Sequence, residues 1–200
     1  MKLHKYLEQV LGNKISISTL RVLVHYKGKI FTIRRLAQDA GASHPEVSAT
    51  VEELEKFGIV QIQPVGRAHQ ISLNEKSYVL NEIIAPILRA EGKTLARIIS
   101  ILKDHLNTKK ITSSVIFGSV SKGEEKEDSD IDVLVISDDF DHATEAIANA
   151  SEDVALCFHT SVSPIIFTKK EFLSKKKGDL IHSILSNHIH ITGLELEKIK

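Results

Sequence analysis

Apolar side chains in the first 60 residues recur at intervals of three and four, the spacing that gives a helix one buried face. The pattern predicts a helix that ends at Gly28, a short helix over 34–40 and a longer helix over 43–57. Ser43 and Glu46 stand three residues apart just before the third apolar stripe, which is the pattern of a capping box. The start of this third helix is therefore the best-defined boundary in the first half of the chain.

After the third helix the pattern changes to an alternation with a period of two. Segments 59–64 and 69–73 alternate apolar and polar residues around a turn at 65–67, which indicates a two-stranded hairpin. A short extended segment is expected over 30–33. Three helices followed by a hairpin, with a glycine turn between the second and third helices, describe a winged helix-turn-helix domain.

The residues LAQDAGASHPEVSATVEELEKFGIVQIQPVGRAHQISL resemble the MarR/ArsR-like winged-helix family, and the resemblance covers about residues 15–76. It implies a recognition helix over 43–57 and a wing tip near Gly66. A helix of this kind enters the major groove of DNA by its N-terminal end, and a basic wing contacts phosphates. The residues expected to contact DNA are Ser43, His44, Ser48, Thr50, Arg67 and His69.

Charge leaves a second role open for this domain. Glu46, Glu52, Glu53 and Glu55 make the expected recognition helix acidic, which opposes an interface dominated by phosphates. Basic side chains nearby are Lys27, Lys29, Arg34, Arg35 and Arg67. The alternative to DNA binding is a docking or dimerisation module.

Residues 77–110 are rich in helix-forming residues and carry two apolar stripes, which Pro86 and Gly92 interrupt. We interpret this segment as a helical connector. Its helices either cover the core of a second domain or pair with another subunit in a homodimer.

The second half of the chain places two carboxylates at the start of an apolar strand. The pattern predicts one strand over 111–117, then Gly118 and Ser119, and a second strand that begins at Asp130 and Asp132. Because side chains two apart on a strand share a face, the two aspartates project together. Like charges at this separation repel unless a cation lies between them, and a hard divalent cation such as Mg²⁺, or Mn²⁺, prefers oxygen ligands.

The segment FGSVSKGEEKEDSDIDVLVI is similar to the signature of the polymerase beta-like minimal nucleotidyltransferases, G-S-x(10)-D-x-D, and the resemblance covers about residues 90–195. It implies a nucleoside triphosphate, bound with Mg²⁺, from which a nucleoside monophosphate is transferred to a hydroxyl of a protein, an RNA or a small molecule. By position, Gly118 and Ser119 would bind triphosphate oxygens, and Asp130 and Asp132 would bind the metal. Lys122 stands where the family often has arginine.

The sequence departs from that family at a third carboxylate. A strand is expected over 160–167, and with the residue before it this strand offers His159, Ser161 and Ser163 on one face but no acid. We also expect a strand in the apolar run over 154–159. Loss of the acid removes a metal ligand and a general base. Two hypotheses follow: a nucleotidyltransferase with a targeting domain, and a nucleotide-sensing, DNA-binding regulator that acts as a dimer.

The composition of the chain does not decide between these two hypotheses. The chain has 200 residues, with 26 basic and 26 acidic side chains. No apolar stretch is long enough for a transmembrane helix, so we expect no membrane partner and a cytoplasmic protein. The single Cys157 lies in an apolar run and is expected to be a buried thiol, while His188 and His190 are read as packing or surface residues, with metal binding as the alternative.

We therefore expect a two-domain α/β chain. A winged helix-turn-helix domain is expected over 1–76, the helical connector over 77–110, and a polymerase beta-like nucleotidyltransferase fold with a mixed sheet over 111–200.

Overall fold

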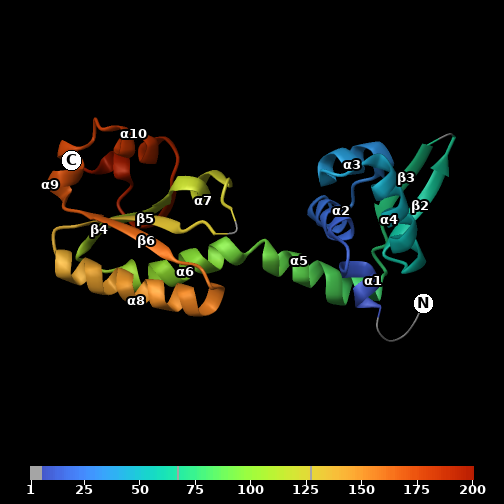
Figure 1. The fold of residues 1–200 in the computed structure, drawn as a ribbon, viewed down its shortest axis with the longest axis horizontal. Coiled ribbons are helices and arrows are strands. Elements are labelled where there is room, and N and C mark those ends of the chain that lie inside the picture. The colour runs from blue at the N-terminus through green and yellow to red at the C-terminus, as the bar shows by residue number, and fades with distance from the viewer. Residues whose placement is uncertain (1–5, 67, 127) are drawn as a thin grey trace. The chain divides into compact units, whose positions relative to one another are not determined.

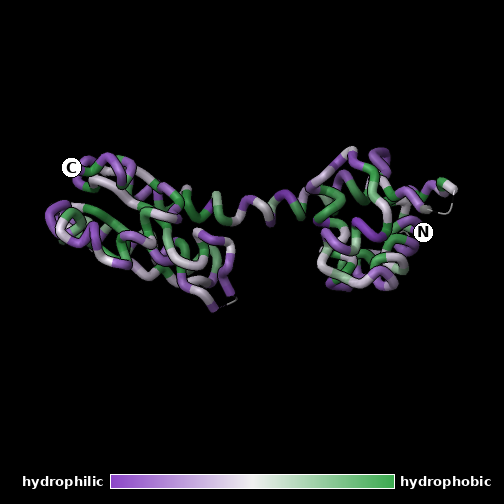
Figure 2. The backbone as a smooth tube through the Cα atoms, turned by 90° about the horizontal axis from the view of Figure 1, so that it is seen from above, coloured by the Kyte–Doolittle hydropathy of each residue, from purple (hydrophilic) through white to green (hydrophobic). Residues whose placement is uncertain are grey.

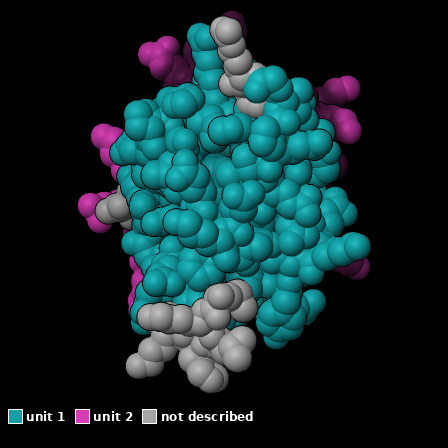
Figure 3. All heavy atoms as spheres, turned by 90° about the vertical axis from the view of Figure 1, so that its right-hand side faces the viewer, with its two compact units in different colours: residues 1–93 teal, residues 94–200 magenta. Residues whose placement is uncertain are grey.

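The computed structural model describes residues 6–66, 68–126 and 128–200. The chain divides into two compact units, Met1–Lys93 and Thr94–Lys200, which Figure 3 colours teal and magenta. The segment over 77–110 contributes helices to both units, up to Glu91 in unit 1 and from Thr94 in unit 2. None of the described helices combines the length and apolar character that crossing a membrane requires.

Unit 1 consists of helices around a small antiparallel sheet. Its elements are α1 (Leu7–Leu11), α2 (Lys14–His25), β1 (Phe31–Thr32), α3 (Ile33–Ala40), α4 (His44–Lys56), β2 (Val60–Val65), β3 (Ala68–Leu73), the π-helical η1 (Val79–Ile84) and α5 (Ala85–Glu91). The strand order is β1-β3-β2. The element order from α2 to β3 is the one that the apolar pattern predicts.

Local chemistry explains the sharp boundaries between α3 and α4. The backbone of Gly41 is left-handed, at a φ of +65°, which ends α3 without the strain that a side chain would cause. The Glu46 carboxylate accepts a hydrogen bond from the Ser43 backbone N–H at 3.0 Å, so the predicted capping box forms. The inner faces of α2, α3 and α4 then pack together through fully buried leucine and valine side chains, among them Leu20, Leu36, Val47 and Leu54.

Unit 2 is built on a mixed sheet of four strands in the order β6-β5-β4-β7. Its elements are α6 (Thr94–Leu106), β4 (Ile111–Phe117), α7 (Gly118–Lys122), β5 (Ile131–Ser137), α8 (Phe140–Phe158), β6 (Val162–Phe167), α9 (Lys169–Ser174), α10 (Asp179–Ser186), β7 (Ile189–Gly193) and the 3₁₀ helix η2 (Leu196–Lys198). Strands β5 and β6 run parallel, and β4 is antiparallel to both β5 and β7.

Helices cover both faces of this sheet (Figure 1). Alternate residues of β5 separate the two cores, with Val133 and Val135 packing toward α6 and α8, and Leu134 and Ile136 toward α9 and α10. Figure 2 shows hydrophobic and hydrophilic residues interleaved along the helices, as one-sided burial requires. Asp132 shares the face of Leu134 and Ile136, because it lies two residues before Leu134.

Two sequence predictions for this unit are wrong. Residues 154–158 end helix α8, rather than forming a strand, because the buried positions Ala143, Ile147, Ala150 and Val154 continue at helical spacing into this run. A short apolar run alone does not distinguish a strand from a helix. Cys157 is exposed on this helix rather than buried, since Val154 is the residue of the run that turns toward the core.

Candidate functional site

The register of three neighbouring strands gathers the predicted residues of unit 2 at one end of the sheet. Asp132 on β5 is paired with Phe117, the last residue of β4, and with Ser163 near the start of β6. Gly118 follows Phe117 directly, and Asp130 lies just before β5. Gly118, the two aspartates and Ser163 therefore meet at one end of the sheet, where β4 ends and where β5 and β6 begin.

Gly118 is the tightest point of this edge. Its backbone is left-handed, at a φ of +76°, and a Cβ placed on it would overlap Asp132 Oδ2 and lie 3.1 Å from Asp132 Cγ. Only a residue without a side chain allows the backbone to approach the carboxylate this closely. The chain turns from β4 into α7 directly beside Asp132.

Helix α7 places Ser119 in its first turn and Lys122 at its last residue. Phe117, rather than Ser119, is the N-cap residue, so capping does not account for a serine at position 119. Ser121 Oγ donates a hydrogen bond to the Gly118 carbonyl at 2.8 Å, which holds the turn closed. The side chain of Lys122 is exposed.

The two aspartates interact electrostatically without a basic partner. Partial burial raises the pKa of Asp132, and the negative charge of Asp130 raises it further. Across the described parts of the chain, the ion pairs within 4.0 Å join other residues, and none includes Asp130 or Asp132. Two carboxylates that share a face and have no arginine or lysine partner make a donor set that suits a hard divalent cation.

Strand β6 and the residue just before it supply hydroxyl groups at the position where the resemblance implies a third carboxylate. Ser161 Oγ donates a hydrogen bond to Asp130 Oδ1, and Ser163 is the direct strand partner of Asp132. His159 is exposed, in a left-handed conformation at the end of α8. Asp153 Oδ2, on α8, lies 2.7 Å from His105 Nε2. This carboxylate therefore interacts with α6 and does not supply the third acid.

The residues of unit 1 that the sequence predicts to contact DNA differ in their exposure to solvent. Ser43 and His44 are exposed at the start of α4, His69 is exposed on β3, and Ser48 is half-buried. Thr50 is 5% exposed and is therefore a core residue, which corrects the prediction that it faces solvent. Arg67 lies outside the described residues.

Sequence reasoning missed one group of side chains in unit 2. His188, Glu195 and Glu197 place one ligand atom each within 4.8 Å of one another. The sequence pointed to His188 only through its spacing from His190. The two glutamates carry no local signal, because they reach His188 only after the chain passes through β7 and bends back.

We predict that Gly118→Ala costs about 1–3 kcal/mol more folding stability than Gly123→Ala. Both glycines have a left-handed backbone, but a Cβ on Gly123 would meet no atom within 4 Å, whereas one on Gly118 would displace the Asp132 carboxylate. Urea unfolding of both variants, followed by circular dichroism, measures the difference. Equal losses for the two variants would show that Asp132 does not occupy this position.

We predict that Asp132→Asn raises the midpoint of thermal unfolding at pH 7 in the presence of a chelator, by on the order of 2 °C. The folded protein raises the pKa of Asp132, so it binds this proton more tightly than the unfolded chain does. Stability is therefore lost as the pH rises from about 3.9, the ordinary aspartate pKa, through the raised pKa.

Asparagine removes this loss, so the variant and the parent should have the same stability at pH 3. Asp128→Asn, a change at an exposed acid just before β5, is the matched control and should have no such effect. A lower midpoint for Asp132→Asn at pH 7 would contradict the assignment.

Comparison with solved structures finds proteins of low identity that cover between half and most of the chain. One similar solved structure, a toxin–antitoxin crystal structure with AMP-PNP, is 22% identical, covers 51% of this chain and 75% of its own, and has a TM-score of 0.34. A MarR family transcriptional regulator from Silicibacter pomeroyi is 21% identical, with coverages of 49% and 68% and a TM-score of 0.36. An archaeal chromatin protein, TrmBL2, is 18% identical, with coverages of 90% and 72% and a TM-score of 0.30. TM-scores of this size do not establish a common fold.

No curated protein matches the chain at a significant level. The family model described as the nucleotidyltransferase domain matches residues 95–187. These residues include Gly118, Ser119, Asp130 and Asp132. The edge around Asp132 therefore lies in a segment that is similar to nucleotidyltransferase domains.

Proposed function

We propose that unit 2 binds a nucleoside triphosphate together with Mg²⁺ or Mn²⁺ and transfers the nucleoside monophosphate to a hydroxyl group, with release of pyrophosphate. The observation that carries this proposal is the pair Asp130 and Asp132 at the start of β5, which has no basic partner in the described chain. The pKa of Asp132 is raised by its partial burial and by the charge of Asp130. The family model of residues 95–187 supports the same reaction class.

Each residue of the edge has a role in this proposal. Asp130 and Asp132 hold the metal, which supplies charge neutralisation for the phosphates when it is bound. The backbone at Gly118 approaches the phosphates closely because no side chain is in the way, and the Ser119 hydroxyl adds a hydrogen-bond donor. Lys122, exposed at the end of α7, offers a mobile positive charge to the triphosphate. Ser161 positions Asp130 through its hydrogen bond.

The acceptor is proposed to be a hydroxyl of a protein, an RNA or a small molecule. Its proton must go to a base, and the register places Ser163 rather than an acid beside Asp132. A serine hydroxyl is neutral at pH 7 and does not accept this proton efficiently. Transfer by this domain would therefore depend on a base outside the edge, such as a group of the acceptor.

The serine at that position favours a second candidate, a nucleotide-sensing regulator that binds DNA. Unit 1 supports it with the order α2, α3, α4, β2 and β3, which we propose to be a winged helix with α4 as the recognition helix. Ser43 and His44 are exposed at its N-terminal end, with Ser48 one turn further on. Arg34 is exposed on α3, whereas Arg35 is engaged by Asp39 at 2.9 Å. A homodimer would place two recognition helices on successive half-sites.

We predict that Mg²⁺-dependent binding of ATP or a non-hydrolysable analogue falls at least about 100-fold in Asp130→Asn with Asp132→Asn, because the metal loses both of its carboxylate ligands. Isothermal titration calorimetry measures the affinity. Asp128→Asn serves as the control for charge and should retain binding. No affinity of the parent chain for nucleotide with either Mg²⁺ or Mn²⁺ would remove the proposal.

Labelled-nucleotide transfer separates the two candidates. Transfer to any acceptor by the parent chain supports the enzyme, whereas transfer that appears only in Ser163→Asp supports a domain that binds nucleotide without turnover. The nucleotide affinity of the variant is compared with that of the parent chain, so that a binding defect is not mistaken for a catalytic one.

We predict that the chain retards genomic DNA fragments in a gel at low salt and that His44→Glu with Arg34→Glu weakens this binding at least tenfold, because both changes put negative charge against phosphates. Lys109→Glu, a charge reversal at an exposed position of unit 2, is the control and should have a much smaller effect. Nucleotide should alter the affinity if unit 2 acts as a sensor. Absence of any retarded fragment would leave unit 1 as a docking or dimerisation module.

A further inference from the structure

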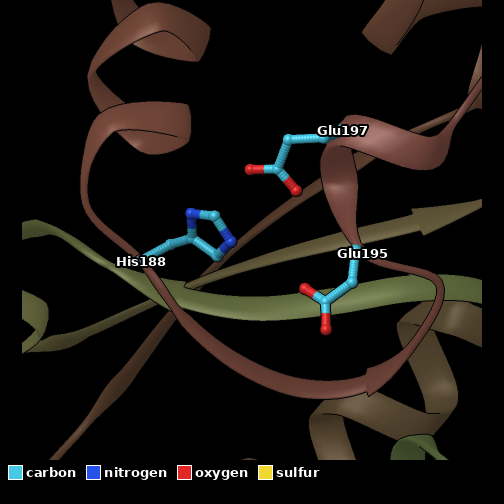
Figure 4. A group of neighbouring side chains, drawn as sticks. All are labelled: His188, Glu195 and Glu197. Carbon is cyan, nitrogen blue, oxygen red and sulfur yellow. The ribbon is translucent and has the colours of Figure 1, made fainter.

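A second group of metal-ligating side chains lies in unit 2, formed by His188, Glu195 and Glu197. His188 precedes β7, and the two glutamates follow it. Their ligand atoms all lie within 4.8 Å of one another. Figure 4 shows the histidine ring and the two carboxylates turned toward a common space. All three residues lie beyond position 187, the last that the nucleotidyltransferase family model matches.

The histidine ring is oriented by its other nitrogen. His188 Nδ1 lies 2.9 Å from the backbone carbonyl of Ile184, on α10, and a carbonyl only accepts hydrogen bonds. The proton of the neutral ring is therefore on Nδ1, and Nε2 keeps its lone pair. Figure 4 shows Nε2 on the side of the ring that faces the glutamates. A ligand histidine held by a hydrogen bond from its second nitrogen is the usual arrangement in metal sites.

The three groups do not neutralise one another directly. The ion pairs found among the described residues have N–O distances of at most 4.0 Å, and none contains His188, Glu195 or Glu197. The spacing is thus longer than an ion pair but short enough for a shared ion. Zn²⁺ binds imidazole nitrogen and carboxylate oxygen at about 2.0–2.2 Å, which puts its ligand atoms about 3.3 Å apart. Modest rotations of the glutamate side chains close that gap.

The surroundings supply two further observations. Leu196, between the glutamates, is fully buried in the same apolar cluster as Val115 and Phe117 of β4, so it anchors both neighbours to the sheet. His190, the strand partner of Val115, has a buried Nε2 without a hydrogen-bond partner among the described residues. This face of β7 therefore carries a second imidazole nitrogen that lacks a partner.

We propose that His188, Glu195 and Glu197 bind one divalent transition-metal ion of the Zn²⁺ type, through one nitrogen and two oxygens. Three protein ligands leave a fourth position for water or for a donor from a bound molecule, as in open zinc sites. Because Glu195 and Glu197 follow β7 and His188 precedes it, the ion would hold the C-terminal segment against the sheet. The proposal does not rest on the function proposed for Asp130 and Asp132.

The test uses the full chain without an affinity tag, freed of metal with a chelator and titrated with zinc sulfate in a calorimeter. We expect one ion per chain and a higher midpoint of thermal unfolding on addition of zinc. His188→Gln should weaken the binding at least tenfold and abolish the increase in the midpoint. Glu195→Gln with Glu197→Gln should do the same, which provides a second variant if the histidine change impairs folding.

Two controls separate this site from the others. His182→Gln changes an exposed histidine of α10 outside the group and should keep the parent affinity. Asp130→Asn with Asp132→Asn should also keep it, so that loss of nucleotide binding and loss of zinc binding are distinguished. The proposal is overturned if the parent chain binds no zinc, if His188→Gln and the glutamate pair retain the parent affinity, or if His182→Gln weakens binding as much as His188→Gln.

Discussion

Repulsion between Asp130 and Asp132 is the constraint around which the edge of unit 2 is arranged. Partial burial raises the pKa of Asp132, and the neighbouring negative charge of Asp130 raises it further. A protein that only needed a stable sheet would place an apolar or a basic residue at one of these positions. The chain instead keeps both acids and surrounds them with a glycine and with serine hydroxyl groups. The unfavourable placement of two acids side by side is explained if the protein functions with a cation bound between them.

Gly118 and Ser163 show how the sheet serves this constraint. The antiparallel pairing of β4 with β5 brings the end of one strand beside the start of the other, so the turn after β4 passes over Asp132. The parallel pairing of β5 with β6 places Ser163 beside Asp132, on the side of β5 away from β4. A mixed sheet is therefore required, because an entirely parallel or antiparallel sheet would not bring these three strand ends together.

Much of this could be predicted from the sequence where the signals are local. Gly41, Ser43 and Glu46 define the boundaries around α4 within a few residues, and Asp130 and Asp132 share a face because a strand has a period of two. The residue beside Asp132 on the third strand, Ser163, follows only from the pairing of β5 with β6, and that pairing depends on contacts between distant segments. The strand predicted over 154–159 is wrong because an apolar run of this length fits both helix and strand, and only the burial pattern of the preceding residues identifies α8.

The same limit explains why the group around His188 escaped notice. Glu195 and Glu197 lie close to His188 only because Leu196 is buried and the chain bends after β7. The two groups of acids also differ in their chemistry. Asp130 and Asp132 offer oxygen alone, which suits Mg²⁺, whereas the imidazole of His188 adds a nitrogen ligand that suits Zn²⁺. Because ligand type selects the ion, the two proposed sites would take up their ions independently of each other.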